Sequence, residues 1–596
     1  MIRIVALRKA ALAGVAGALA WEIAMRAFRL GGLDLFDIVR ILGTLAFPDG
    51  PPIAWWTAGV AIHAAVGAIW AIFYAYFFWS VLNWRPAFQG MAFSILPALL
   101  ALFVAYPQLH MMHLGGPVAQ FDTIAVMRAI SGREAVGLLL GHLIYGGVLG
   151  ALYTHPVGYP TARPRKVAVR AGPTILSGAG CARAPSPQPF LFATGIECSY
   201  PTIENGRWRR DQMDATGHYR HWRTDFERAR EVGVSHLRYG PPLHLIFEGP
   251  GRYDWSFTDA VMRAMRDMGL EPIIDLCHFG VPNWLGNFQN PDLPRALRDY
   301  AADFAGRYPW VRFYTPVNEM FVCAKISALD GLWNEQLRDE RSFVTAVAHM
   351  AKANILMRQA ILARRPDAVF VDSESGEFYQ PCCPDPEIVR IADFENERRF
   401  LALDLLYAHP VSDIMRTHLH ANGMTPGDYA WFMAQAVPRR TIVGIDYYEW
   451  NEKLVDNEGN PQSLGELFGW YVIANRYFER YRRPMMHTET NRQDAREATR
   501  WLWRQWHNVQ LLRKAGVPLV GFTWYSLIDQ IDWDRALGRA LGNVNPVGLF
   551  DLNRDVRPVG LAYRHLIRLH RSQPGFFGSA VLDELLAEEA APCLVS

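Results

Sequence analysis

Long apolar runs dominate the chain before residue 155. Four segments approach the roughly 20 residues that a helix needs to cross a bilayer. The run from Trp55 to Val81 contains no charged residue and has Trp at both ends, as an interfacial aromatic belt would. The alternative is that these segments are buried helices of a soluble protein. A soluble core would then have to bury four such segments within about 150 residues, which favours the membrane interpretation. The pattern predicts four transmembrane helices within residues 1–154: Ala10–Phe28, Trp55–Val81, Phe88–Tyr106 and Ala135–Tyr153.

The first apolar segment has two interpretations. Its basic start, short apolar run and Ala18-Leu19-Ala20 are typical of a signal peptide with a cleavage site. Apolar character continues past Trp21, however, which favours an uncleaved helix. Glu22 and Arg26 interrupt that helix four residues apart, a spacing at which they could pair within the membrane and so lower the cost of burying either.

Lys and Arg are more frequent in the flanks that would face inward if the N-terminus were inside. Cytoplasmic flanks of membrane helices carry such an excess. We therefore expect an integral protein of the bacterial inner membrane with both termini, and the unit after residue 154, in the cytoplasm. Four histidines lie in or beside the helices, and packed or interfacial histidines are expected there rather than a metal or haem pair: His63, His110, His113 and His142.

The pattern changes after residue 154. Residues 155–189 are rich in Pro, Gly, Arg and Ala without a period, which predicts a linker. Short apolar strands then alternate with amphipathic helices up to residue 575, and 576–596 would be a C-terminal tail. Eight strands in this alternation predict an α/β fold, a (β/α)8 TIM barrel: Phe192–Cys198, Val234–Tyr239, Pro272–Cys277, Val311–Val317, Ala368–Ser373, Thr441–Tyr447, Pro484–Thr488 and Leu519–Trp524.

Composition narrows the classes of function. The net charge of +2 gives no basic excess for nucleic acid, so none is expected as a partner. The seven cysteines are odd in number and none has the C-x-x-C spacing, which favours a reducing compartment and argues against zinc. We expect neither a metal nor another cofactor.

Two glutamates follow predicted strands of the barrel. Glu319 ends "VRFYTPVNE", and Glu489 lies in "RRPMMHTETNR" after the seventh strand. Active sites of such barrels are built at the carboxyl ends of the strands. Two opposed carboxylates are what glycoside hydrolysis uses, one as proton donor and the other as nucleophile or base.

Several motifs resemble glycoside hydrolase family 1, the retaining β-glycosidases. "TPVNEM" resembles the T-x-N-E-P motif of the acid/base, and "HTETN" resembles the I/V-T-E-N-G motif of the nucleophile. "EPIIDLCHFGVPNWL", "VGVSHLRYG", "GIDYYEW" and "WYSLIDQIDWDRA" are similar to further family segments in the same order. The likeness covers about Phe190 to Arg568 and extends to an atypical bacterial branch of the family.

The resemblance implies a role for each matching residue. Glu319 would be the acid/base and Glu489 the nucleophile of a covalent glycosyl-enzyme mechanism. The substrate-binding set would comprise Asn318 and His278 on sugar hydroxyls, Arg238 and Tyr448 on the Glu489 carboxylate, Trp524 as the platform under the sugar ring, and Asp532 and Trp533 at its far hydroxyls.

The chain also departs from the family pattern. "SYPTIENG" replaces the Q-I-E-G segment, so the Gln that binds two sugar hydroxyls has no clear match. Asp532 replaces a Glu, Met320 replaces the Pro after the acid/base, and Thr490-Asn491 replace Asn-Gly. The reaction class therefore follows from the resemblance better than the identity of the sugar.

These patterns predict a membrane-tethered retaining β-glycosidase, β-glucosidase- or β-galactosidase-like. Its partners would be a carbohydrate or glycolipid substrate and the lipid bilayer, and the sequence leaves the oligomeric state open. One alternative is a transglycosylase that acts on a glycolipid or a lipid-linked sugar. A non-catalytic membrane sugar sensor, and helices that form a small transporter unit, are further alternatives.

Overall fold

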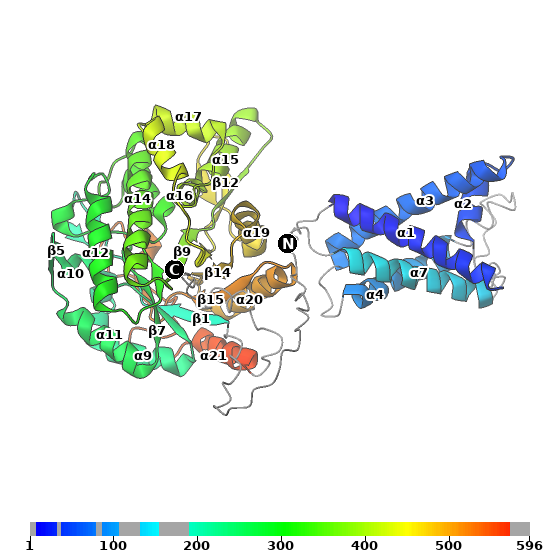
Figure 1. Ribbon diagram of the computed structural model, residues 1–596. Helices are drawn as coiled ribbons and strands as arrows, with labels where there is room; N and C mark the ends of the chain where they lie inside the picture. The colour runs from blue at the N-terminus through cyan, green and yellow to red at the C-terminus, as the bar shows by residue number, and fades with distance from the viewer. Residues whose placement is uncertain (1–6, 33–36, 79–85, 106–131, 154–189, 572–596) are drawn as a thin grey trace, which may run out of the picture. The chain divides into compact units, whose positions relative to one another are not determined.

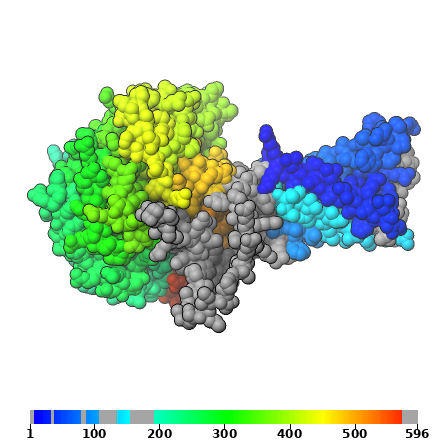
Figure 2. All heavy atoms as spheres, in the orientation of Figure 1, coloured from blue at the N-terminus to red at the C-terminus, as the bar shows by residue number. Residues whose placement is uncertain are grey.

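The computed structural model describes residues 7–32, 37–78, 86–105, 132–153 and 190–571, which divide into two compact units. One unit is helical and precedes residue 170, and the other contains the barrel. Figures 1 and 2 draw the helical unit in blue to cyan and the barrel unit in green to red. The predicted linker, residues 155–189, and the predicted C-terminal tail, residues 576–596, lie outside the described residues, so those boundaries stay predictions.

The helical unit consists of long apolar helices. Four of them are long and apolar enough to cross a membrane, which confirms the four predicted segments to within a few residues. A short helix between the first two was not predicted. The elements are α1 (Leu7–Leu30), α2 (Ile38–Ala46), α3 (Pro52–Phe73) continued by η1 (Tyr74–Phe78), α4 (Pro86–Leu100) continued by η2 (Ala101–Ala105), and α7 (Gly132–Leu152).

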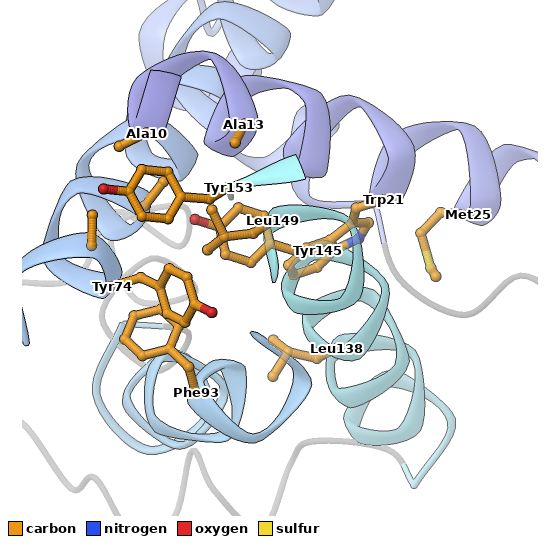
Figure 3. Close-up of a cluster of buried hydrophobic side chains, with 12 residues drawn as sticks. Ala10, Ala13, Trp21, Met25, Tyr74, Phe93, Leu138, Tyr145, Leu149 and Tyr153 are labelled. Carbon is orange, nitrogen blue, oxygen red and sulfur yellow. The ribbon is translucent and has the colours of Figure 1, made fainter. Parts of the chain in front are cut away.

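Glycines bring these helices close together. A Cβ at Gly90 would lie 1.9 Å from the Gly146 carbonyl oxygen, and one at Gly14 would lie 2.3 Å from that of Gly67. Small residues at such crossings let membrane helices pack through their backbones. Aromatic side chains fill the remaining interior, among them Trp21, and Figure 3 shows them between α1, α4 and α7.

The pairing of Glu22 with Arg26 that their spacing suggested is wrong. Glu22 Oε1 lies 2.9 Å from Nδ1 of His63 on α3, and Arg26 lies 3.8 Å from the carboxylate of Asp37. Neighbouring elements thus supply a closer partner for each charge than the helix itself does. His142 donates from Nδ1 to the Leu138 carbonyl at 2.9 Å, so both described histidines are packed as expected. His110 and His113 lie outside the described residues.

Eight parallel strands close into a barrel in the order β1-β15-β14-β11-β9-β8-β7-β4, which confirms the predicted fold class. Each runs close to its predicted range, and their interior is packed with aliphatic and aromatic side chains. The strands are β1 (Leu191–Gly195), β4 (His236–Tyr239), β7 (Glu271–Asp275), β8 (Phe313–Thr315), β9 (Val369–Ser375), β11 (Thr441–Asp446), β14 (Met485–His487) and β15 (Leu519–Trp524).

Helices surround this barrel (Figure 1). The longer ones are α9 (His218–Val232), α11 (Ser256–Met268), α12 (Leu293–Arg307), α14 (Glu340–Arg364), α15 (Pro386–Arg398), α17 (Asp413–Ala421), α18 (Pro426–Met433), α19 (Gly469–Tyr481), α20 (Ala498–Lys514) and α21 (Pro558–Arg571). Several of them bury an apolar face, as the amphipathic pattern predicts, among them α9 and α11.

A small sheet outside the barrel was not predicted. It has the order β10-β12-β13 and lies on the loops that follow β9 and β11. Its strands are Phe378–Pro381, Glu452–Val455 and Pro461–Ser463. Because loops at the carboxyl ends of barrel strands form the mouth of the site, this sheet adds residues to it.

Candidate active site

Glu319 and Glu489 line one cavity of about 550 Å³. Glu319 follows β8 and Glu489 follows β14, so both come from carboxyl ends of barrel strands. Glu319 has a left-handed backbone with φ of 35°, and its N–H donates to the Ser373 carbonyl at 2.9 Å. This bond to the loop side of β9 fixes the point at which the chain leaves β8.

Each oxygen of the Glu489 carboxylate has its own donor. Arg238 donates from Nη1 to Oε1, and the Tyr448 hydroxyl donates to Oε2 at 2.6 Å. Arg238 lies on β4, whereas Tyr448 follows β11. Bonds to both oxygens fix the plane of the carboxylate.

Arg238 also connects the other predicted residues. Its Nη2 donates to Asp275 at 2.9 Å and to the Asn318 side-chain oxygen. His278 Nδ1 lies 2.7 Å from the same Asp275 oxygen, and the Asn318 amide lies 3.3 Å from His278 Nε2. The structure thus brings all of these predicted residues into one buried network.

The electrostatics of the site favour a protonated Glu319. Burial raises its pKa well above the usual carboxyl range, and the nearby Asp446 and Glu489 carboxylates raise the pKa further. A carboxyl group held neutral in this way can donate a proton near neutral pH. Burial opposes protonation of His278, but the Cys198 thiol and the Asp275 carboxylate outweigh it and raise the pKa of that imidazole.

Glu197 lines the cavity and was missed by sequence reasoning. It follows β1, and its carboxylate accepts from the Ser199 N–H at 2.9 Å and from Gln530 Nε2 at 2.6 Å. Burial raises its pKa. Glu197 lies just before "SYPTIENG", the segment that departs from the family motif. The missing Gln of that segment is the sequence signal that could have drawn attention to Glu197.

Charged residues of the outer wall were missed as well. Lys325 lies 3.7 Å and Lys453 lies 3.8 Å from the Glu377 carboxylate, and all three line the cavity. Lys325 also donates to the Tyr379 hydroxyl at 3.0 Å. These charged residues come from separate parts of the chain and lie in no motif, so no sequence pattern singled them out.

Two predicted contact residues lie elsewhere. Trp524 is fully buried, and its indole donates to the Val547 carbonyl at 3.0 Å rather than facing the cavity. The next residue, Tyr525, is the one beside Arg238 and His278. Successive side chains of a strand point to opposite faces, so only one of the pair can face the barrel interior.

Asp532 organises a loop instead of facing the cavity. Its carboxylate accepts from the backbone N–H groups of Leu541, Gly542 and Asn543 at 2.8–3.0 Å and pairs with Arg210 at 2.5 Å. With these four donors the fully buried carboxylate has little capacity left for a sugar. Its neighbour Trp533 does line the cavity.

One group of side chains among the described residues could hold a metal ion. Donor atoms of Cys198, Asp275 and His278 lie within 4.8 Å of one another. The Asp275 oxygen already bonds Arg238 and His278, so an ion would have to replace those bonds. The expectation that no metal or other cofactor binds stays a prediction.

The arrangement combines a carboxyl group with a raised pKa and a carboxylate held by a guanidinium and a phenol in one cavity. In such a pair the protonated carboxyl group can protonate a leaving group, and the carboxylate can attack the atom to which that leaving group was bonded. The cavity volume is within the range of about 300–1,000 Å³ that is usual for small-molecule sites.

Comparisons with known proteins agree with this architecture. The chain is 22% identical over 402 residues to β-glucosidase A of Thermotoga maritima, a match that covers 59% of this chain and 87% of that protein. It is 21% identical over 397 residues to mouse Klotho, where the match covers 36% of Klotho. No protein-family model matches the chain.

Solved structures show the same fold. The β-glucosidase from Thermotoga maritima in complex with glucoimidazole superposes with a TM-score of 0.55 and 17% identity, covering 64% of this chain and 98% of that one. The family 1 β-glucosidase from the same organism in complex with isofagomine lactam also gives a TM-score of 0.55. The barrel of this chain is therefore similar in sequence to β-glucosidase A of Thermotoga maritima and has the fold of the family 1 β-glucosidase from that organism.

Proposed function

We propose that the barrel is a retaining β-glycosidase that hydrolyses O-glycosidic bonds through a covalent glycosyl-enzyme. The observation that carries the proposal is the pair of unlike carboxyl groups in one cavity. Glu319 has a raised pKa, whereas both Glu489 oxygens accept hydrogen bonds. Unlike environments assign acid and nucleophile roles to two otherwise equivalent groups.

In the first step Glu319 protonates the glycosidic oxygen while a Glu489 oxygen attacks the anomeric carbon. The aglycone leaves as an alcohol, and the sugar stays bound to Glu489 as an ester. In the second step Glu319, now ionised, takes a proton from water as the water attacks the same carbon. The Arg238 and Tyr448 hydrogen bonds keep Glu489 aimed at that carbon in both steps.

Sugar recognition would use the network behind the carboxylates. Asn318 and His278 offer polar atoms beside Glu489, and Glu197 with Gln530 offers a second polar edge. Trp533 supplies an aromatic face on the cavity wall. Glu197 would take the hydroxyl-binding role for which the sequence has no Gln match.

The helical unit supports a membrane location for this activity. Four helices are long and apolar enough to cross a bilayer, so we propose that they tether the glycosidase to a membrane, the bacterial inner membrane with a cytoplasmic barrel. A substrate at the membrane, such as a glycolipid, fits that location. Transfer of the sugar to an acceptor other than water would use the same ester.

Release of nitrophenol from aryl β-glycosides tests the proposal. The full chain in detergent would be assayed on glucoside, galactoside, fucoside and mannoside, beside its Glu489→Gln variant. We expect turnover of at least one glycoside and a loss of about a thousandfold or more in the variant, because removing a nucleophile abolishes the covalent route.

The matched control is Glu387→Gln, which changes an exposed Glu paired with Arg390 on α15. It should retain full activity. Proton NMR of the first product would show the β-anomer if the mechanism retains configuration. Turnover that persists in Glu489→Gln, or an α-anomer as first product, would contradict the proposed roles.

A further inference from the structure

The helical unit contains polar groups that tethering does not require. Glu22 on α1 pairs with His63 on α3 at 2.9 Å, and His142 lies on α7. Trp21 lies against both imidazoles, with ring centroids 4.9 Å from His63 and 4.6 Å from His142. Ionisable side chains inside apolar helices are expensive to bury, and they mark functional sites by default.

Trp21, His63 and His142 line a cavity of about 330 Å³. Most of its wall is aliphatic, and Trp21, His63, His142 and Tyr145 supply the polar part. Leu100 and Val104, which also line it, are 42% and 48% exposed, so the cavity opens to the apolar surface of the unit. An apolar pocket with a few converging polar groups is the usual form of a small-molecule site.

The polar groups of this cavity include unused hydrogen-bonding capacity. His142 donates from Nδ1 to the Leu138 carbonyl, which can only accept, so Nε2 of the neutral ring carries a lone pair. Neither this Nε2 nor that of His63 has a partner among the described residues. Trp21 Nε1 is buried and likewise has no partner in the described part of the chain.

We propose that this cavity binds an apolar molecule that carries a hydroxyl group, such as a long-chain alcohol or a phenol. A hydroxyl both donates and accepts, so it can donate to His142 Nε2 and accept from Trp21 Nε1. A carbonyl would satisfy Trp21 but leave both imidazoles without a donor. An anionic head would meet the Glu22 carboxylate behind His63, which disfavours it.

Close packing holds the polar wall in place. A Cβ at Gly141 would lie 2.2 Å from the Trp21 ring, so α7 passes directly against the indole. Tyr145, one turn further along α7, donates from its hydroxyl to the Gly67 carbonyl at 2.6 Å. Figure 3 shows Trp21 and Tyr145 at this crossing of α1 and α7. The indole and the imidazole are thus positioned before a ligand arrives.

Photolabelling tests the proposal. The full chain would be placed in phosphatidylcholine nanodiscs with a diazirine-bearing hexadecanol, and labelled peptides would be identified by mass spectrometry. We expect label on the cavity-lining parts of α1, α3 and α7. Unlabelled hexadecanol should compete, and its methyl ether should compete about fivefold less well or worse, because it has lost the donated hydrogen bond.

Two variants locate the site. Trp21→Phe and His142→Phe each remove one partner of the hydroxyl and should lower labelling by about fivefold. Trp56→Phe changes a 41% exposed indole elsewhere on α3 and should leave labelling unchanged. The methyl-ether comparison on the unchanged chain remains valid if a variant fails to fold. Equal competition by alcohol and ether would overturn the proposal and leave a lipid-filled groove without recognition.

Discussion

Asp446 is a further carboxyl group near Glu319 and Glu489, at the end of β11. It is fully buried, and both its oxygens lie within hydrogen-bond distance of the Ser373 hydroxyl, at 2.9 and 2.7 Å. Burial raises its pKa, and the Glu489 carboxylate raises that pKa further. The segment "GIDYYEW" resembles the G-I-N-Y-Y segment of glycoside hydrolase family 1, and Asp446 stands where that segment has Asn, so this chain has a titratable group in place of a neutral amide.

This substitution leads to a prediction about pH. Glu319 must be protonated to act as the acid, so activity should be lost as pH rises through its raised pKa. Asp446 is one cause of that raised pKa. Asp446→Asn removes a group whose ionisation raises the pKa of Glu319, so that pKa should fall and the alkaline limb of kcat/KM should move to lower pH.

The measurement is a pH profile of kcat/KM for the best aryl glycoside. The acid limb should move less than the alkaline limb. Asp413→Asn changes an exposed carboxylate on α17 and serves as the control. An alkaline limb that stays in place in Asp446→Asn would show that another group sets it.

Single residues also show what sequence reasoning could reach at the site. Glu319, Glu489, Arg238 and their partners lie in motifs, so their positions at strand ends followed from the pattern. Trp524 was predicted to contact the sugar, but its neighbour Tyr525 is the residue beside Arg238 and His278. The sequence alone does not show which of two adjacent aromatic side chains faces the site. The place of Glu377 depends on a loop path, which no local pattern encodes.

The secondary-structure elements were predicted more completely than the site. Strands buried on both faces read as continuous apolar runs, and helices between them show a 3.6-residue period, so type and order followed from the sequence. Ends were less certain. The predicted strand Val311–Val317 extends two residues beyond the end of β8. The chain turns away at Glu319, which has a left-handed backbone conformation, and apolar content does not reveal such a turn.

Helix packing in the helical unit gives a prediction at this scale. A Cβ at Gly146 would lie 2.3 Å from the Gly90 carbonyl oxygen, which is backbone and cannot move aside. Gly146→Ala should therefore destabilise the α4–α7 pair by about 1–3 kcal/mol, as overpacking does. Thermal unfolding of the full chain in detergent, followed by circular dichroism, measures the effect.

The neighbouring glycine is a matched control. At Gly147 a Cβ would meet the Met91 methyl group at 3.0 Å, and that flexible side chain can shift. Both substitutions gain the same intrinsic helix propensity, so Gly147→Ala should be neutral or slightly stabilising. Equal melting temperatures for the two variants would mean that α4 and α7 do not cross through these glycines.

At the scale of the whole molecule, the chain joins two units of different composition. Apolar runs without charge mark the first and alternating strands and helices mark the second, which is why the sequence separated them. Each unit has its own packed interior. A barrel with its own core is expected to fold and act without the helices.

Removal of residues 1–189 tests that independence and the purpose of the tether together. The full chain should sediment with membranes and resist a high-salt wash, whereas 190–596 should be soluble.

On a soluble aryl glycoside both forms should show the same kcat/KM, because the cavity is formed within the barrel unit. On a glycolipid in vesicles the full chain should be faster, because anchoring in the same bilayer raises the effective concentration of substrate. Equal rates of the two forms on the glycolipid would mean that the helices serve something other than substrate delivery. If the soluble form were inactive on both substrates, the barrel would depend on the helices.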